Sequence, residues 1–393
     1  MSIPPRTFPS DGFTLLPENI RFEEEKYSEY KPENFYPVHL GEVFESRYQV
    51  VAKLGWGTVS TIWLCRDLHT LLTAIGRKRP GHSQDETQEL AVSHHIKSLN
   101  IDADHHAGSE LVRVSLDDFN ITGPHGSHQC LVFPTLGWSV NRLRKMFDEA
   151  KAPFSKNLLQ SYVFTTLYGL DFLHQVGVVH TDLSSRNIMT SSKSATTAAS
   201  AVEQAELGSP SPRKVLADRT IHLSYDMQRV LGPVVIIDLG DARLGEPGQK
   251  QSGDAMPGVY RAPETIADME WDSKIDIWSF GVMIWSLFEE ANLFSAFKDG
   301  NLDDELHFAE MVSLIGPPPK QFLERSDRCC RYWDSEGNWI AATPIPDQTL
   351  ESRETRLEGE DKELLLTLAR KILRWFPEER PTAGDLFEDG FLT

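Results

Sequence analysis

The hydrophobic pattern of this chain of 393 residues changes its period near Leu136. Before that point, apolar residues alternate in YQVVAKL from Tyr48 and in STIWLCRDL from Ser60, and CLVFPTL from Cys130 forms an apolar run. Such runs, rich in β-branched and aromatic residues, predict strands. Beyond Gly137, helical spacing prevails. The chain is therefore expected to adopt an α+β fold whose small sheet and helical part meet near Leu136, with a cleft where they meet.

Four segments have the spacing of helices. One lies within the strand-rich part, at Gln84–Leu99. The other three follow the change of period and cover Lys156–Gln175, Ser273–Glu290 and Asp361–Trp375. Ser273–Glu290 is apolar on nearly every side, which predicts a helix buried in the core rather than on the surface.

The pattern divides the chain into three regions. Residues 1–47 mix Pro, Glu and aromatic residues without a clear period, which predicts an N-terminal extension packed on a domain. Residues 48–136 form the small sheet-containing lobe and residues 137–393 the larger helical lobe. An insert at about 191–232 begins with a Ser/Ala-rich stretch that we expect to be partly disordered.

Composition excludes several classes of protein. The 58 acidic and 39 basic residues give a net charge of -19, which repels nucleic acid and attracts cationic partners. The four scattered cysteines form neither a disulfide framework nor a metal pair, which favours the cytosol or the nucleus. No apolar run reaches the length of a membrane span of roughly 18 residues. We expect a monomer without direct nucleic-acid or membrane binding.

A glycine turn separates the first two predicted strands. It contains Leu54, Gly55, Trp56, Gly57 and Thr58 and leads to Ile62. Glycine leaves backbone N–H groups exposed, so the turn could approach the phosphates of a nucleotide. An ordinary hairpin turn would have the same pattern, and Ser60 stands where a third glycine would complete the motif.

The segment His180-Thr181-Asp182-Leu183-Ser184-Ser185-Arg186-Asn187 follows the helix predicted at Lys156–Gln175. This segment closely resembles the catalytic loop of the eukaryotic protein kinases. The resemblance implies that Asp182 orients the attacking hydroxyl and accepts its proton, and that Asn187 binds Mg²⁺. Ser184 replaces the lysine that many kinases carry two residues after the aspartate. Arg186 is expected to supply that cation to the transferring phosphoryl group.

Further kinase-like motifs follow in the expected order. The apolar strand Val234–Ile237 leads into Asp238-Leu239-Gly240, which resembles the magnesium-binding DFG motif and implies that Asp238 binds Mg²⁺ at the ATP phosphates. The resemblance also implies a buried ion pair between Glu264 and Arg380, and that Asp276 holds the backbone of the catalytic loop.

Within the kinases, the chain resembles the SR-protein kinases of the CMGC group and their fungal relatives. The similarity rests on LGWGTVSTIWLCRDL, on Thr181, on Leu239, on YRAPE from Tyr260 and on RYWDSEGNW from Arg331. That family phosphorylates serine in Arg/Ser-rich segments, a substrate class that an acidic enzyme suits. The family also implies that Ala74, Phe133 and Leu136 line the adenine pocket.

The strand that should carry the phosphate-binding lysine departs from the kinase pattern. It reads Leu71-Leu72-Thr73-Ala74-Ile75-Gly76-Arg77-Lys78. Gly76 falls at the position of the lysine when TAI is aligned with the motif, whereas counting from the glycine turn without gaps places Arg77 there. Gly76 and Lys78 share a face of an alternating strand, so Lys78 can take this role after a local slip, with Glu89 as its partner. An equal alternative is that Lys78 belongs to a solvated basic run.

Two functions remain open on the sequence alone. The first is an active serine/threonine kinase using ATP and Mg²⁺ on basic or Arg/Ser-rich proteins, with Asp182, Asn187 and Asp238 present in order. The second is a pseudokinase scaffold whose ATP binding is impaired by the altered lysine strand. A third reading, tyrosine specificity, is suggested by Arg186 alone.

Overall fold

The computed structural model describes residues 3–58, 60–69, 72–78, 87–152, 154–191, 194–227, 231–289 and 291–392; side chains are described for all of these except 72–78 and 194. The chain forms two compact units, and each is described by itself. Unit 1 contains residues 1–93, 113–138 and 190–232, and unit 2 contains residues 94–112, 139–189 and 233–393. One boundary between the units falls after Trp138.

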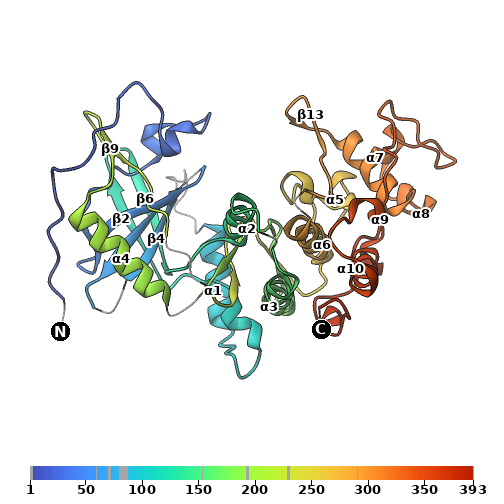
Figure 1. The fold of residues 1–393 in the computed structure, drawn as a ribbon, viewed down its shortest axis with the longest axis horizontal. Coiled ribbons are helices and arrows are strands. Elements are labelled where there is room, and N and C mark those ends of the chain that lie inside the picture. Colours follow the sequence, from blue (N-terminus) through green and yellow to red (C-terminus); the bar gives the residue numbers. More distant parts are fainter. Residues whose placement is uncertain are drawn as a thin grey trace. The chain divides into compact units, whose positions relative to one another are not determined.

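Unit 1 is built on a six-stranded antiparallel sheet (Figure 1). The strands are arranged in the order β1-β2-β3-β4-β6-β5. Their bounds are β1 Val43–Phe44, β2 Tyr48–Trp56, β3 Ser60–Asp67, β4 Leu72–Lys78, β5 Asp117–Gly123 and β6 Gly126–Pro134. The sheet confirms the predicted small antiparallel sheet. Its apolar cluster includes Tyr48, Val50, Trp63, Cys65 and Val132, so alternate residues of neighbouring strands pack on one face.

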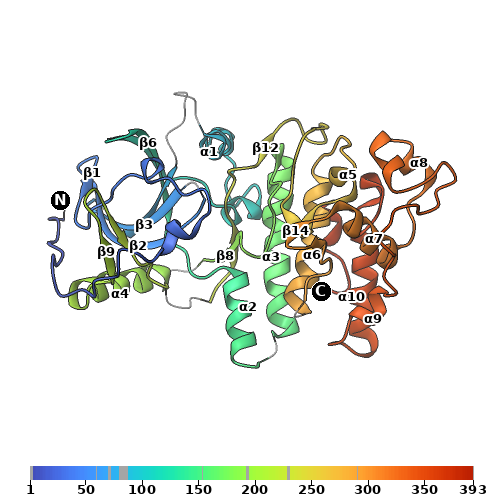
Figure 2. The same cartoon turned by 90° about the horizontal axis from the view of Figure 1, so that it is seen from above.

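The Ser/Ala-rich part of the insert, which we expected to be partly disordered, forms helix α4. It spans Ser194–Gly208 and lies along the sheet of unit 1, as Figures 1 and 2 both show. Ala198, Ala199 and Val202 are buried in an apolar cluster with residues of β2 and β3. Alanine is the best helix former, and its small side chain allows close approach to a sheet. The expectation of disorder was wrong because the low complexity of the segment concealed this apolar helix face.

Two short strands complete the insert, and the N-terminal extension packs against them. Strand β9 (Arg213–Val215) pairs with β10 (Thr220–His222). The extension contributes the 3-10 helices η1 (Glu23–Lys26) and η2 (Pro32–Asn34). Lys53 of β2 is almost completely buried and is hydrogen-bonded to Glu24, while Lys214 of β9 donates to Glu25 Oε1 at 2.8 Å. Buried charges need such partners, so these ion pairs fix the extension on the sheet.

Unit 2 is mainly helical. Figure 2 shows α3 (Lys156–Gln175), α6 (Lys274–Phe288) and α10 (Gly359–Ile372) side by side. These three helices match the predicted segments, and α6 is buried along its whole length from Ile275 as its apolar sequence requires. The remaining helices of four or more residues are α1 Gln88–Ser98, which continues from unit 1 into unit 2, α2 Val140–Glu149, α5 Pro263–Ile266, α7 Asp304–Ile315, α8 Lys320–Leu323 and α9 Leu350–Arg353.

Short strands and 3-10 turns connect these helices. Strand β7 (Val178–Val179) pairs with β12 (Arg243–Leu244), β8 (Ile188–Thr190) with β11 (Val234–Ile236), and β13 (Phe297–Lys298) with β14 (Asn301–Leu302). The 3-10 turns are η3 Ala107–Leu111, η4 Gly258–Tyr260, η5 Asp327–Arg331, η6 Pro377–Glu379 and η7 Gly384–Leu386. The strand pairs β7–β12 and β8–β11 flank the segment that resembles a catalytic loop.

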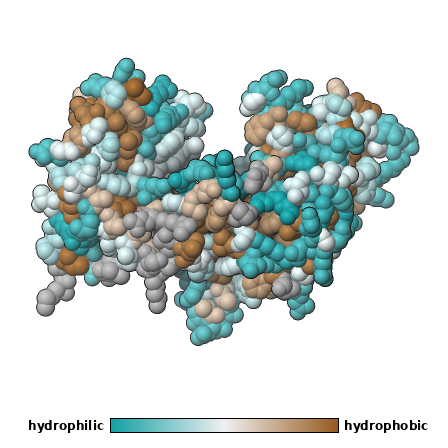
Figure 3. Space-filling model, in the orientation of Figure 1, coloured by the Kyte–Doolittle hydropathy of each residue, from teal (hydrophilic) through white to brown (hydrophobic). Residues whose placement is uncertain are grey.

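On the face drawn in Figure 3, apolar residues lie in several patches with hydrophilic residues between them. Among the described residues, none of the helices has both the length and the apolar character needed to cross a bilayer. All four cysteines are free thiols, and only Cys330 is exposed.

Two buried histidines predict that the protein loses stability in acid. His307 of α7 and His222 of β10 are buried, and burial lowers the pKa of each from 6.5 to about 3. The unfolded chain binds a proton near the ordinary pKa, whereas the folded protein resists protonation until about 3. Stability is therefore complete above the ordinary pKa and falls with decreasing pH, by roughly 2 kcal/mol for each histidine at about pH 5.

Urea unfolding at neutral pH and at about pH 5 measures this effect. His307→Phe should remove the part of the acid loss that belongs to unit 2. Phe294→Leu is the matched control, because Phe294 packs against the His307 ring at 4.9 Å but does not titrate. The account fails for His307 if the histidine variant and the control show the same dependence on pH.

Candidate active site

The loop His180–Asn187 is held at its start by a buried carboxylate. It connects β7 to β8, and the carboxylate of Asp276 in α6 accepts hydrogen bonds from the backbone N–H groups of His180 at 2.8 Å and Thr181 at 2.9 Å. His174 of α3 contacts the same carboxylate at 2.9 Å. Asp276 is completely buried. The expectation that Asp276 holds the backbone of this loop is therefore confirmed.

A glycine allows the chain to enter this loop. Gly177, between α3 and β7, has a φ of +73°, and a Cβ atom there would lie 1.9 Å from the backbone oxygen of Gly245. Any side chain would force the two segments apart. The position of β7, and with it the start of the loop, therefore depends on this glycine.

Asp182 and Asn187 contact each other directly. The Asn187 Nδ2 donates to the Asp182 carboxylate at 2.8 Å and to the Asp182 backbone oxygen at 2.8 Å. Burial raises the pKa of Asp182, an effect that the charge of His180 and the hydrogen bond from Asn187 oppose. Since Nδ2 is the donor, the Asn187 oxygen Oδ1 is the atom available to a cation. Arg186 lies between them in the chain, and its side chain is exposed.

Asp238 lies beside this pair. It follows β11, its side chain is exposed, and its charge is one of the causes that raise the pKa of Asp182. The neighbouring Ile237 binds the loop twice, because its N–H donates to the Asn187 backbone oxygen at 2.9 Å and its own backbone oxygen contacts His180 Nε2 at 3.0 Å. Asp182 and Asn187 are therefore in direct contact, and the residue next to Asp238 is hydrogen-bonded to their loop within unit 2.

Two residues of this region have strained backbone. Thr181 has a φ of 66° and Asp238 a φ of 64°, a region that residues other than glycine rarely occupy. The hydrogen bond from Thr181 Oγ1 to the Asp241 oxygen, 2.8 Å long, supports this conformation. Strain held in this way is typical of functional sites.

The predicted nucleotide-binding residues lie in unit 1. Gly57 closes the turn between β2 and β3 through a hydrogen bond of its N–H to the Ser60 oxygen at 2.8 Å. A Cβ atom at Gly55 would contact nothing within 4 Å, so packing within the described residues does not require this glycine. The other turn residues are Leu54, which packs near α4, Trp56 and Ile62, which are both about one-third exposed, and Thr58.

The altered strand is β4. Its register places Gly76 opposite Ile62 and Leu131, Ala74 opposite Leu64 and Phe133, and Lys78 opposite Ser60. The side chains of Ala74 and Lys78 lie outside the described part of the structure, so their predicted roles remain predictions. Phe133 and Leu136 are both buried at the end of β6.

Glu89, which the sequence predicts to pair with Lys78, lies near a different cation, Arg113, for which the sequence contains no signal. Glu89 of α1 is buried, and its Oε1 lies 3.8 Å from a guanidinium nitrogen of Arg113. The Arg113 guanidinium also lies 4.1 Å from the centre of the Phe133 ring. No motif marks Arg113, because the contact depends on how α1, β6 and the segment before β5 pack together.

The ion pair between Glu264 and Arg380 is confirmed. The two guanidinium nitrogens of Arg380 lie 2.6 and 2.7 Å from the two carboxylate oxygens of Glu264. Both residues are buried, and Arg380 also donates to the backbone oxygens of Lys274 and Arg374. This pair joins α5 to the segment after α10 and supports unit 2 without contacting Asp182.

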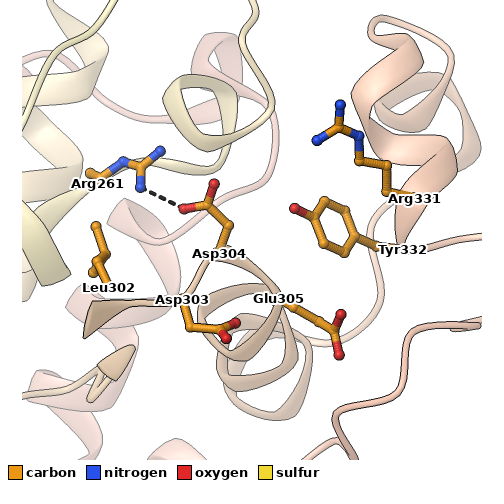
Figure 4. A pocket seen from close by; sticks show the side chains of 7 residues that line it. All are labelled: Arg261, Leu302, Asp303, Asp304, Glu305, Arg331 and Tyr332. Carbon is orange, nitrogen blue, oxygen red and sulfur yellow. Dashed lines mark hydrogen bonds and ion pairs between the residues drawn. The ribbon is translucent and has the colours of Figure 1, made fainter. Parts of the chain in front are cut away.

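An open pocket of about 610 Å³ lies at the start of α7 (Figure 4). The acidic residues Asp303, Asp304 and Glu305 line it together with Arg261, Leu302, Arg331 and Tyr332. Asp304 is partly neutralised, because Arg261 contacts it at 2.6 Å and Arg328 at 2.7 Å. Asp303 caps α7 by accepting from the Leu306 N–H at 2.8 Å, and Glu305 accepts from the Thr343 N–H at 2.6 Å.

Comparison with known proteins identifies the family. The protein kinase domain matches residues 48–392. A serine/threonine protein kinase of Aspergillus fumigatus is 39% identical over 99% of this chain and 95% of its own length. The serine/threonine-protein kinase SRPK of Physarum polycephalum is 27% identical over 94% of this chain and 91% of its own length.

A solved kinase domain has the same fold, with a TM-score of 0.68 at 20% identity, and the match covers 92% of this chain and 99% of that one. The matched family, the related sequences and the arrangement of the catalytic loop agree. The chain therefore belongs to the protein kinase family and is an ATP-using serine/threonine kinase related to the SRPK enzymes.

Proposed function

We propose that this kinase, with Mg²⁺, transfers the γ-phosphate of ATP to serine and threonine in basic, Arg/Ser-rich protein segments. The observation that carries the proposal is the grouping of Asp182, Asn187 and Asp238. Asp182 orients the substrate hydroxyl and accepts its proton. Its raised pKa makes it a stronger base than an exposed carboxylate.

Asp238 and Asn187 have the chemistry that a magnesium site needs. Hard cations prefer carboxylate and amide oxygens, and both are present here. No cluster of three or more His, Cys, Asp or Glu suited to a metal occurs in the part of the chain that the structure describes. The remaining ligands would then be nucleotide phosphates and water, as is usual for Mg²⁺. When bound, this ion neutralises charge on the phosphates that are being separated.

Arg186 is proposed to stabilise the transferring phosphoryl group. Its side chain is exposed, follows Asp182 by four residues and precedes Asn187. A guanidinium can hydrogen-bond two phosphate oxygens at once, which a lysine cannot do. Arg186 thus takes the place of the lysine for which this chain has Ser184.

Three observations support basic substrates. The net charge of -19 attracts cationic segments. The pocket at the start of α7 is lined by three acidic residues and by two arginines, Arg261 and Arg331, so its acidic side chains exceed its basic ones by one. Related enzymes also include proteins named for this class, the SRPK of Physarum polycephalum and an SRSF protein kinase.

Cytoplasm and nucleus are the proposed compartments, since the chain keeps four free thiols.

Phosphorylation of two matched peptides tests the substrate class. The purified protein is incubated with labelled ATP and Mg²⁺ and either an Arg/Ser-repeat peptide or a Glu/Ser-repeat peptide of equal length. We expect kcat/KM for the Arg/Ser peptide to be at least about tenfold higher and to fall with added salt, because exposed charges are screened. Equal rates would refute the substrate class, whereas no transfer to any protein or peptide would favour a scaffold without activity.

A further inference from the structure

Strand β4 lacks a side chain where the kinase pattern has its phosphate-binding lysine. The register of β4 is set on both sides, by β3 and by β6. When Thr73-Ala74-Ile75 is aligned with the kinase motif, Gly76 takes the place of this lysine. Kinases need a cation paired with the glutamate of the helix after this strand, because the pair orders the site that holds the α and β phosphates. The glutamate is present in this chain as Glu89.

Arg113 provides a positive charge at Glu89. Its guanidinium lies 3.8 Å from the Glu89 carboxylate, and the side chains are only 14% and 8% exposed. The same guanidinium lies over the ring of Phe133 at 4.1 Å. Phe133 pairs with Ala74 across β4 and β6, and both are residues that the kinase resemblance places in the lining of the adenine pocket. Arg113 therefore lies next to a predicted residue of that pocket.

The chemistry of an arginine side chain is well suited to this buried position. Its planar guanidinium can pair with a carboxylate at its edge while its face stacks on an aromatic ring. The two contacts hold the guanidinium between α1 and β6. A charge pair with so little exposure is weakly screened, so its removal affects the position of Glu89 strongly.

We propose that Arg113 is a positioning residue of this kinase, and that it pairs with Glu89 in place of the strand lysine to order the nucleotide-binding part of unit 1. The proposal rests on the proposed ATP-dependent transfer. From the sequence, Lys78 is the candidate for this role, with a solvated basic run as the alternative. If Arg113 has this role, the affinity for nucleotide depends on Arg113. If Lys78 has it, the affinity depends on Lys78.

Substitution of each cation separates the assignments. Arg113→Met and Lys78→Met are compared with Arg66→Met, the matched control, since the Arg66 side chain in unit 1 is equally little exposed, at 14%, and pairs with Glu203 at 2.5 Å. The readouts are the KM for ATP, kcat, the affinity for ADP by titration calorimetry, and Tm. We expect Arg113→Met to raise the KM for ATP and the ADP Kd about tenfold or more, and Arg113→Lys to recover part of this loss.

A lysine placed at position 76 provides a rescue. Gly76→Lys in the Arg113→Met background should restore affinity for ADP, because it returns the cation to the strand. The proposal is overturned if Arg113→Met lowers Tm like Arg66→Met but leaves ADP affinity unchanged, or if Lys78→Met alone weakens nucleotide binding. Calorimetry with ADP needs no phosphoryl transfer, so it decides the role of Arg113 even if the wild-type protein phosphorylates no substrate.

Discussion

Replacing Asp182 with asparagine should lower kcat by about 10²–10⁴-fold, the range expected when a general base is removed. Asparagine has nearly the same shape, and its amide oxygen can still accept the hydrogen bond that Asn187 Nδ2 makes at 2.8 Å. The loop should therefore keep its structure, while the group that accepts the hydroxyl proton is lost. The KM for ATP and the Tm are expected to change little.

Single-turnover transfer from labelled ATP measures this effect. Asp171→Asn is the matched control, because Asp171 is a carboxylate of α3 in the same unit that contacts His106 and Gln175 instead of the catalytic loop. It should retain the wild-type rate. If Asp182→Asn remained within about threefold of wild type, a general-base role for Asp182 would be excluded.

Removing Arg380 should destabilise the protein by roughly 3–5 kcal/mol, since the buried Glu264 carboxylate would lose its partner. Arg380→Met keeps much of the side-chain volume, so the loss would come mainly from the charge and from the five hydrogen bonds to Glu264, Lys274 and Arg374. Urea denaturation followed by tryptophan fluorescence would report the change, because Trp278 lies 5.0 Å from the guanidinium.

A double-mutant cycle with Glu264→Gln separates the pair from its surroundings. If the ion pair accounts for the loss, the two substitutions together should cost much less than the sum of each alone. Additive losses would show that Arg380 stabilises unit 2 through its backbone contacts instead.

The sequence predicted those features that depend on the spacing of residues within one segment. The segments around Asp182, Asn187 and Asp238 each carry a recognisable spacing, and helices such as α3 and α6 are long and strongly patterned. Asp276 and the pair of Glu264 with Arg380 followed from the resemblance to kinases. These are the residues whose neighbours the family pattern already specifies.

What the sequence could not predict depends on contacts between distant segments. Arg113 has no local signal, because its contacts with Glu89 and Phe133 arise only when α1 and β6 pack. Lys53 occupies an ordinary polar position of a strand and is buried only because the extension brings Glu24 to it. The Ser/Ala-rich composition of α4 likewise indicated disorder, since its apolar face consists largely of alanine.

The central claim is that Asn187 and Asp238 hold one nucleotide-bound divalent cation beside Asp182. Electron paramagnetic resonance of Mn²⁺, used in place of Mg²⁺, measures this binding directly in the presence and absence of ADP. The account predicts that wild-type protein and Asp182→Asn bind Mn²⁺ tightly only with ADP, and that Asp238→Asn loses this binding. Unchanged Mn²⁺ affinity in Asp238→Asn, with ADP still bound, would contradict it.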